Sequence, residues 1–186
     1  EDAVNSLNIQ LVESKIDNAM VIHLESHKWS VKNFLEIINT QKNMHPIVNL
    51  NPTNHNSIDL LKSLNKEFNL KGIKLHPRLQ NYDIELDCVV DLINFCSEIN
   101  LPVIIDAFPD GNFILQGLTP LKFAIVAKKC PKTKIVWAHM GGYKVLEFLM
   151  LAKRLPNVFF DFSYSFLYFK NTPTFENIIY AFQNMK

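Results

Sequence analysis

Six polar side chains follow short apolar runs of the chain, and their types suit acid–base or metal chemistry. They are His23, Asn49, His76, Asp106, His139 and Asp161. Histidines and carboxylates are the usual general acids, general bases and metal ligands of enzymes. The carboxyl ends of parallel strands meet at one edge of a sheet or one mouth of a barrel, where α/β enzymes hold their sites. We therefore predict one mouth lined by these residues.

His139 is the strongest candidate for chemistry. It ends the apolar run Lys134–Ala138, and Met140, Gly141 and Gly142 follow it. Glycines at such a turn let the backbone approach a ligand closely. We predict that His139 is a general acid or base, or a metal ligand, at the tip of a strand. The alternative is a buried histidine that is hydrogen-bonded to a neighbouring loop.

Asp106 and Lys74 both lie in or next to apolar runs, where a charge needs a partner. Asp106 follows the run at residues 101–105, so we expect it to bind a metal, or else to cap a helix or pair with a lysine. Lys74 shares a strand face with His76, because side chains alternate with a period of two. It is a candidate catalytic residue, and an ion pair with Asp106 is the structural alternative.

Four further residues are predicted to contact substrate. Arg78 follows a strand tip and suits a carboxylate or phosphate, although it could equally be a solvated loop charge. The other three are the tip residues His76, Asn49 and Asp161, each of which alone would more often be structural. The aromatic run at residues 164–169 either lines the mouth or packs in the core.

These residues are positioned by apolar runs that alternate with amphipathic helical patterns. The runs lie at residues 19–24, 46–50, 72–76, 101–106, 134–138 and 158–162. Helical patterns lie at residues 31–41, 57–68, 86–99, 121–129, 143–154 and from 175 onward. Continuous apolar runs are typical of parallel strands covered on both faces. The alternation indicates an α/β fold built from about six βα units.

The period of the polar tips favours a barrel. From His23 to Asp161 is 138 residues over five intervals, about 28 residues each, which suits a compact βα unit. No Gly-rich phosphate loop marks a doubly wound sheet. A complete (β/α)8 barrel needs about 250 residues. We predict a single domain over residues 1–186 of the (β/α)8 TIM-barrel type, incomplete at its first and last strands.

Composition excludes several classes of function. The chain has 186 residues, 48% hydrophobic and 20% charged, with a net charge of +1, so we predict no nucleic-acid partner and no membrane partner. Its 3 cysteines show no C-x-x-C spacing, which argues against a disulfide framework or a zinc ribbon. No signal peptide or membrane-length apolar run is present. We expect a cytoplasmic protein with a small-molecule substrate, and a homo-oligomer is left open.

Four segments resemble a known family. GIKLHPRLQNY, LPVIIDAFPDG, KIVWAHMGG and NVFFDFS are similar, in order and spacing, to segments of the amidohydrolase-related TIM-barrel hydrolases (amidohydrolase family 2). This family includes nonoxidative decarboxylases. KIVWAHMGG with KLHP ahead of it is the most specific part. The resemblance implies a divalent metal at the barrel mouth, usually zinc, with manganese also compatible with a carboxylate ligand.

The resemblance also implies individual roles. His139 matches the catalytic histidine on the sixth strand of the family, Lys74 matches a lysine of the KLHP motif, and Asp106 stands where the family usually has a metal-binding histidine. The sequence lacks the His-x-His of the first strand and the Gly-Ser-Asp of the last. Residues 1–186 alone are therefore expected to be inactive.

The function implied is that of a metal-dependent hydrolase of the amidohydrolase superfamily. Its substrate would be small and carboxylated or cyclic, with His139 as general acid or base. A nonoxidative decarboxylase of the same family is one alternative. The other is a degenerate barrel that binds a small ligand without catalysis, and Asp106 in the histidine position is its main support.

Overall fold

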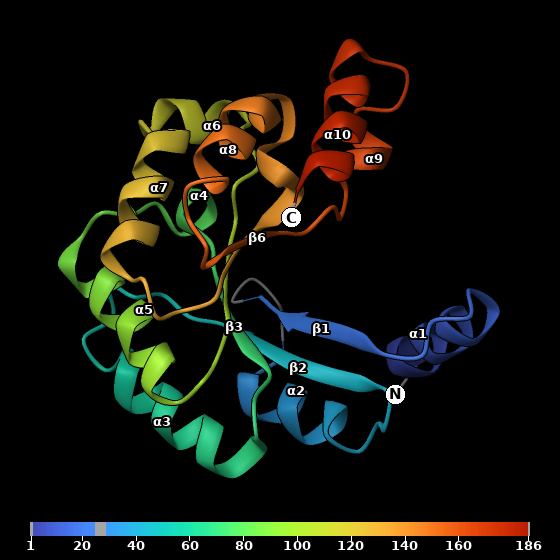
Figure 1. The fold of residues 1–186 in the computed structure, drawn as a ribbon. Helices are drawn as coiled ribbons and strands as arrows, with labels where there is room; N and C mark the ends of the chain where they lie inside the picture. The colour runs from blue at the N-terminus through green and yellow to red at the C-terminus, as the bar shows by residue number, and fades with distance from the viewer. Residues whose placement is uncertain (1, 25–28, 186) are drawn as a thin grey trace.

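Six parallel strands form one sheet in which spatial order follows chain order (Figure 1). The structure is a computed structural model, and it describes residues 2–24 and 29–185. The strands are β1 Ala19–His23, β2 Met44–Asn49, β3 Gly72–Leu75, β4 Val103–Ile105, β5 Ile135–Trp137 and β6 Val158–Phe160. All five pairings are parallel. This sequential order is the one a (β/α)8 barrel uses.

Helices connect successive strands, as the alternating pattern predicted. The longer helices are α1 Asp2–Glu13, α2 Val31–Ile38, α3 Ser57–Phe68, α5 Asp87–Glu98, α7 Pro120–Lys129, α8 Val145–Ala152 and α10 Pro173–Asn184. Short helices not predicted from the sequence are α4 Pro77–Gln80, α6 Gly111–Leu115, α9 Ser165–Tyr168 and the 3₁₀ segment η1 Ala138–Lys144. Each of these short elements follows the end of a strand, where it shapes the mouth.

Capping side chains set where the helices begin. Ser30 accepts a hydrogen bond from the backbone N–H of Asn33 at the start of α2, and Thr119 accepts one from Lys122 at the start of α7. Each cap satisfies a backbone donor that the first turn leaves without a partner. Pro120 follows directly, at a position where its missing N–H costs nothing.

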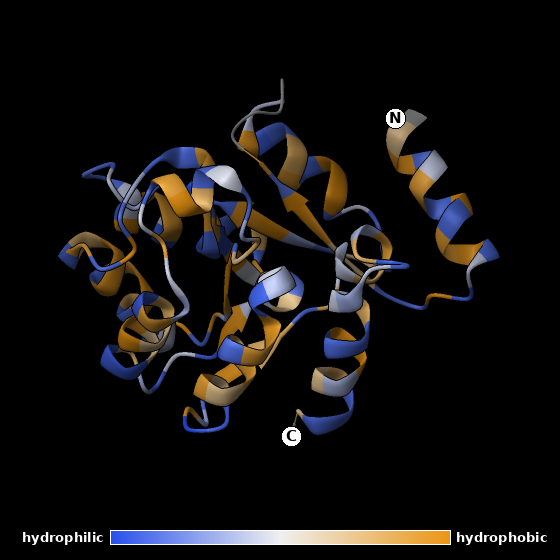
Figure 2. Cartoon of the chain, turned by 90° about the horizontal axis from the view of Figure 1, so that it is seen from above, coloured by the Kyte–Doolittle hydropathy of each residue, from blue (hydrophilic) through white to orange (hydrophobic). Residues whose placement is uncertain are grey.

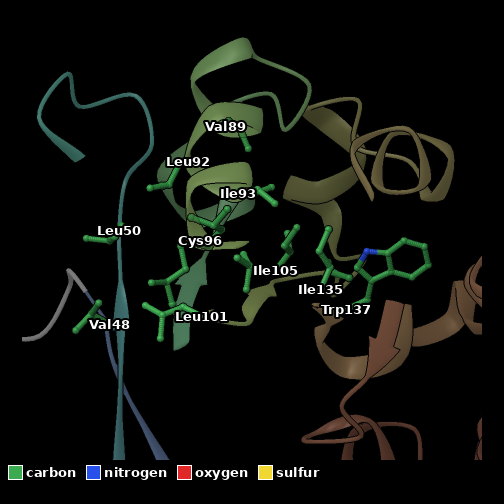
Figure 3. Close-up of a cluster of buried hydrophobic side chains, with 14 of the residues drawn as sticks. Val48, Leu50, Val89, Leu92, Ile93, Cys96, Leu101, Ile105, Ile135 and Trp137 are labelled. Carbon is green, nitrogen blue, oxygen red and sulfur yellow. The ribbon is translucent and has the colours of Figure 1, made fainter. Parts of the chain in front are cut away.

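The main core lies between the sheet and its covering helices. Val89, Leu92, Ile93 and Cys96 on α5 face Ile105 and other strand residues (Figure 3). Cys96 is fully buried and free, so it packs as part of this core, whereas Cys88 at the start of the same helix is exposed. Burying an aliphatic side chain of this size contributes about 1.5–3 kcal/mol. These contacts fix the strands and thereby the residues at their tips.

The other face of the sheet carries a smaller apolar cluster around Ile47, Ile104 and Ala138. Lys74 is paired in register with Asn49 on one side and with Ile104 on the other. Because side chains alternate along a strand, this row continues into the polar residues at the strand tips. The mouth is therefore the end of an apolar row that faces away from the covering helices.

The sheet is open within the described residues. β1 pairs only with β2, and β6 pairs only with β5. The helix α1 lies beside the β1 end of the sheet (Figure 2), where Val4 and Leu11 are buried in the main core and Asn8 donates to Gln41 just beyond α2. No helix in the part of the chain that the structure describes is long and apolar enough to cross a membrane.

Candidate active site

Asp106, just beyond β4, is the residue at which the other polar side chains of the mouth meet. Its side chain is only 1% exposed. Its Oδ1 lies 3.5 Å from Nε2 of His76 and 3.3 Å from Nε2 of His139. Burial alone would raise the pKa of Asp106, but the hydrogen bond from His139, together with the neighbouring His76, Lys74 and Arg78, holds it well below its usual range. Asp106 is therefore a carboxylate at any physiological pH.

Arg78 crosses the mouth from α4 and joins two carboxylates. Its Nε donates to Oδ2 of Asp106 at 3.0 Å, and its Nη1 donates to Oδ2 of Asp110 at 2.6 Å. The guanidinium carbon lies 5.8 Å from the ring centroid of Phe108, within reach of a cation–π contact. The side chain is 20% exposed, so the alternative of a solvated loop charge is wrong. Arg78 is held in place on a buried carboxylate.

Asp110 also belongs to the site, although no pattern in the sequence singles it out as a site residue. Its Oδ1 accepts from the N–H of Phe113, so it caps α6 while its Oδ2 pairs with Arg78. At the far end of α6, Gln116 Nε2 donates to the backbone oxygen of Arg78 at 2.9 Å. An Asp directly before a Gly is a recognisable cap signal. Its ion pair spans 32 residues, and no local pattern shows that.

His76 is held as a neutral ring with a defined tautomer. The backbone N–H of Leu79 donates to its Nδ1 at 3.3 Å, so the ring proton lies on Nε2. Burial is the largest cause that lowers the pKa of His76, to about 4, and the attraction of Asp106 only partly offsets it. At neutral pH His76 therefore directs an N–H, rather than a lone pair, toward Asp106.

His139 reaches the mouth with both ring nitrogens engaged. Its Nδ1 lies 2.8 Å from the backbone oxygen of Ser163, and a carbonyl oxygen can only accept, so Nδ1 carries a proton. Its Nε2 faces Asp106. The alternative of a histidine hydrogen-bonded to a neighbouring loop therefore holds for Nδ1, whereas Nε2 lies in the mouth. The ring is 20% exposed, which leaves it accessible to a ligand.

The backbone around His139 is strained. His139, Met140, Gly141 and Gly142 have φ values of 60°, 51°, 71° and 51° in succession. The left-handed region costs a residue with a side chain about 1–3 kcal/mol. The hydroxyl of Ser165 donates to the backbone oxygen of His139 and helps to hold this turn. Such strain is concentrated at functional sites, where the surrounding structure fixes a side chain that a relaxed backbone would misplace.

Lys74 is buried in the mouth without the predicted ion pair to Asp106. Among the described residues, Asp106 makes an ion pair with Arg78 and is contacted by Nε2 of His76 and of His139. The planar fork of Arg78 reaches the carboxylate from α4 and satisfies both oxygens. Burial lowers the pKa of Lys74, although the charges of Asp106 and Asp161 oppose the shift. Lys74 thus contributes a nearby charge rather than a direct contact.

The remaining predicted tip residues lie around this centre. Asp161 Oδ1 accepts from the N–H of Ser163 at 2.8 Å, and so supports the loop whose carbonyl holds His139. Asn49 Nδ2 donates to the backbone oxygen of Lys74 at 3.0 Å. His23 and Asn49 both line a separate hollow of about 270 Å³. The prediction of one mouth is therefore confirmed for His76, Asp106 and His139, with Asp161 behind them.

The described donors do not fit a divalent metal. No group of three or more His, Cys, Asp or Glu residues within residues 2–24 and 29–185 is placed to hold one. His76 presents an N–H, and both oxygens of Asp106 accept hydrogen bonds from Arg78. Nε2 of His139 is hydrogen-bonded to Asp106, and zinc sites use three or four protein ligands. The geometry gives no support to metal ligation by Asp106 and His139.

The fold and the site together define an α/β protein of the TIM-barrel type with polar groups at the carboxyl ends of its strands. The amidohydrolase family matches the sequence over residues 43–182, which is more than half of the chain. The chain belongs to the amidohydrolase family. The resemblance drawn from the sequence motifs is thereby confirmed.

Two solved structures show the fold to which the chain is similar. An uncharacterised TIM-barrel protein of Bordetella bronchiseptica superposes with a TM-score of 0.80 at 17% identity, over 94% of this chain and 63% of its own. A probable 2-pyrone-4,6-dicarboxylic acid hydrolase of Acinetobacter baumannii, with citric acid bound, gives 0.70 at 16% identity, over 97% of this chain and 67% of its own. The chain thus spans about two thirds of each structure. No curated protein matches the sequence.

Proposed function

We propose that this chain carries the acid–base and anion-binding part of an amidohydrolase-type hydrolase acting on a small carboxylated, cyclic substrate. The observation that carries the proposal is the convergence of His139 and Arg78 on the buried carboxylate of Asp106. Ionisable groups whose pKa values are strongly shifted by burial and by charged neighbours cluster at functional sites. Family membership supports the hydrolase class.

Arg78 is the proposed anchor for the substrate carboxylate. A guanidinium has five N–H donors, and three of them make hydrogen bonds to Asp106 and Asp110. The others are directed at no described residue. An anion placed on this edge gains charge-assisted hydrogen bonds in a partly buried setting.

His139 is the proposed proton carrier. Its Nε2 lies 3.3 Å from Asp106, which is longer than the usual 2.7–2.9 Å of a charge-assisted hydrogen bond. A water molecule or a leaving oxygen can therefore compete for the proton at Nε2. Asp106 stabilises the protonated ring during the transfer, and the carbonyl of Ser163 fixes the orientation of the ring. No step is assigned to a metal.

The substrate class follows from the anchor and from one similar structure. The Acinetobacter structure is of a probable hydrolase of a cyclic dicarboxylic acid and holds citric acid. We infer that this chain, too, accepts a small ring ester with at least one carboxylate. A barrel that binds such acids without turning them over is the alternative outcome of the test.

The test is hydrolysis by the protein at its natural length. A panel of small lactones with one or two carboxylates is assayed by proton release. Replacing His139→Asn removes the proton carrier and is expected to lower kcat by about 10²–10⁴-fold. The matched control is His45→Asn. His45 lies at the start of β2, and its ring is hydrogen-bonded to Asn18. Undiminished turnover by the His139 variant would overturn the proposal. Ligand binding with no turnover by the wild type would favour the binding barrel.

A further inference from the structure

The side chain of Asp110 occupies a donor of Arg78 in the same mouth. Nη1 of Arg78 lies 2.6 Å from Oδ2 of Asp110, whose side chain is 32% exposed. Asp106, in contrast, is 1% exposed and takes Nε and Nη2 of the same guanidinium. The buried carboxylate of Asp106 fixes the guanidinium of Arg78. The more exposed carboxylate of Asp110 covers part of the guanidinium edge that Asp106 leaves open.

We propose that Asp110 is an internal competitor for the substrate carboxylate, which it resembles chemically and which displaces it from Arg78. The proposal rests on the anion site of the proposed function and names a further residue that sets its affinity and selectivity. A ligand with a carboxylate gains the Nη1 hydrogen bond only by replacing that of Asp110. A neutral ligand cannot make this exchange, so the pair discriminates against uncharged molecules.

The helix α6 is tied to Arg78 at two points, which gives the exchange a structural consequence. Asp110 caps the first turn of α6 through Oδ1, and Gln116 from the end of α6 donates to the backbone oxygen of Arg78. Release of Oδ2 leaves the cap bond to Phe113 in place. The helix therefore keeps its N-terminus while it loses one of its two attachments to Arg78.

The chain offers conservative variants that separate competition from folding. Asp110→Asn and Asp110→Ser both keep a side chain that caps helices well, but neither carries a charge. The matched control is Asp83→Asn. Asp83 also accepts a backbone hydrogen bond, from Glu85, and also pairs with a cation, Lys122 at 2.5 Å, outside the mouth. Its replacement removes one negative charge from the chain without freeing Arg78.

The experiment is isothermal titration of wild type and variants with citrate at fixed pH and ionic strength. Both Asp110 variants are expected to bind citrate about fivefold more tightly than wild type, since a partly exposed ion pair of this kind contributes that much. Asp83→Asn should bind like wild type. If the Asp110 variants bind no more tightly than Asp83→Asn, the competitor role is wrong.

A second variant distinguishes failure of the competitor role of Asp110 from failure of the anion site at Arg78. Arg78→Gln is expected to weaken citrate binding at least tenfold, because it removes the cation that both carboxylates contest. Loss of binding in Arg78→Gln with no gain in Asp110→Asn overturns only the competitor role. Unchanged citrate binding in Arg78→Gln overturns the anion site and the competitor role together.

Discussion

At the scale of single residues, the mouth is organised by one buried carboxylate. Asp106 is 1% exposed and would be unstable there without its three cationic or N–H partners. Two of those partners, His76 and Arg78, come from the segment that follows β3, and His139 follows β5, so their positions depend on two separate segments of the chain. The same contacts that stabilise Asp106 orient His139 and Arg78 for chemistry. Structure and proposed function therefore share the same side chains.

His76 makes stability depend on pH in a predictable direction. Its pKa is about 4 in the fold and about 6.5 in an unfolded chain. Between these values the unfolded chain binds a proton that the folded chain does not, so stability falls as pH drops from 6.5 toward 4. From pH 7 to 4.5, wild type should lose about 2 kcal/mol more than His76→Asn, which keeps an acceptor at the cap. Urea unfolding measures this, and equal losses in both proteins would contradict it.

Zinc binding tests the donor set directly. Among the described residues of the Asp106 cluster, Nε2 of His139 already contacts Asp106, and Arg78 already engages both oxygens of the carboxylate. Residues 1–186 are therefore expected to retain less than about 0.2 zinc per chain after dialysis, since zinc sites use at least three protein ligands. Elemental analysis provides the readout. One zinc per chain that is lost on Asp106→Asn would show that the cluster is a metal site.

At the scale of elements, the turn between β5 and α8 sets the position of His139. A Cβ added at Gly141, where φ is +71°, would lie 1.9 Å from a ring carbon of Phe148. Gly141→Ala is therefore expected to destabilise the fold by about 3 kcal/mol or more. Gly111→Ala is the matched control, because no atom lies within 4 Å of its added Cβ, and its change should stay within about 1 kcal/mol. Thermal unfolding of the two variants checks the contrast, and similar melting temperatures would count against it.

The longer elements were predictable from the sequence, and the short ones were not. Continuous apolar runs and amphipathic patterns located all six strands and the long helices, because burial sets those patterns. The predicted strands were one to three residues too long at their ends in most cases, since polar tips such as Asp106 leave the ladder. The helix expected from Tyr143 begins at Val145 because the preceding residues adopt positive φ. In the sequence, only Gly141 and Gly142 indicated such a turn.

The candidate site was predicted as a set of residues, without its pairings. His76, Asp106 and His139 do meet, because parallel strands align their tips. The structural alternative paired Asp106 with Lys74, but its partner is Arg78, and Asp110 was missed. Both depend on side-chain reach across different loops, over 28 and 32 residues of sequence. Periodicity carries no information about contacts of that kind.

At the scale of the whole molecule, the described residues form an open sheet with the mouth at one end. β1 and β6 each lack a second neighbour among the described strands, and Met20 and Phe159 on these edge strands are 60% and 44% exposed. Because the described strands enclose only part of the mouth, water can enter it, and water weakens electrostatic catalysis. The expectation that residues 1–186 alone are inactive thus stays a prediction.

The central claim is that Asp106 and His139 act as one catalytic unit. The most direct test is a double-mutant cycle on kcat/KM of the protein at its natural length, with Asp106→Asn, His139→Asn and both together. Residues that act as a unit give losses that do not multiply. We predict that the double variant is no slower than the slower single variant. Losses that multiply would show two independent residues and contradict the account.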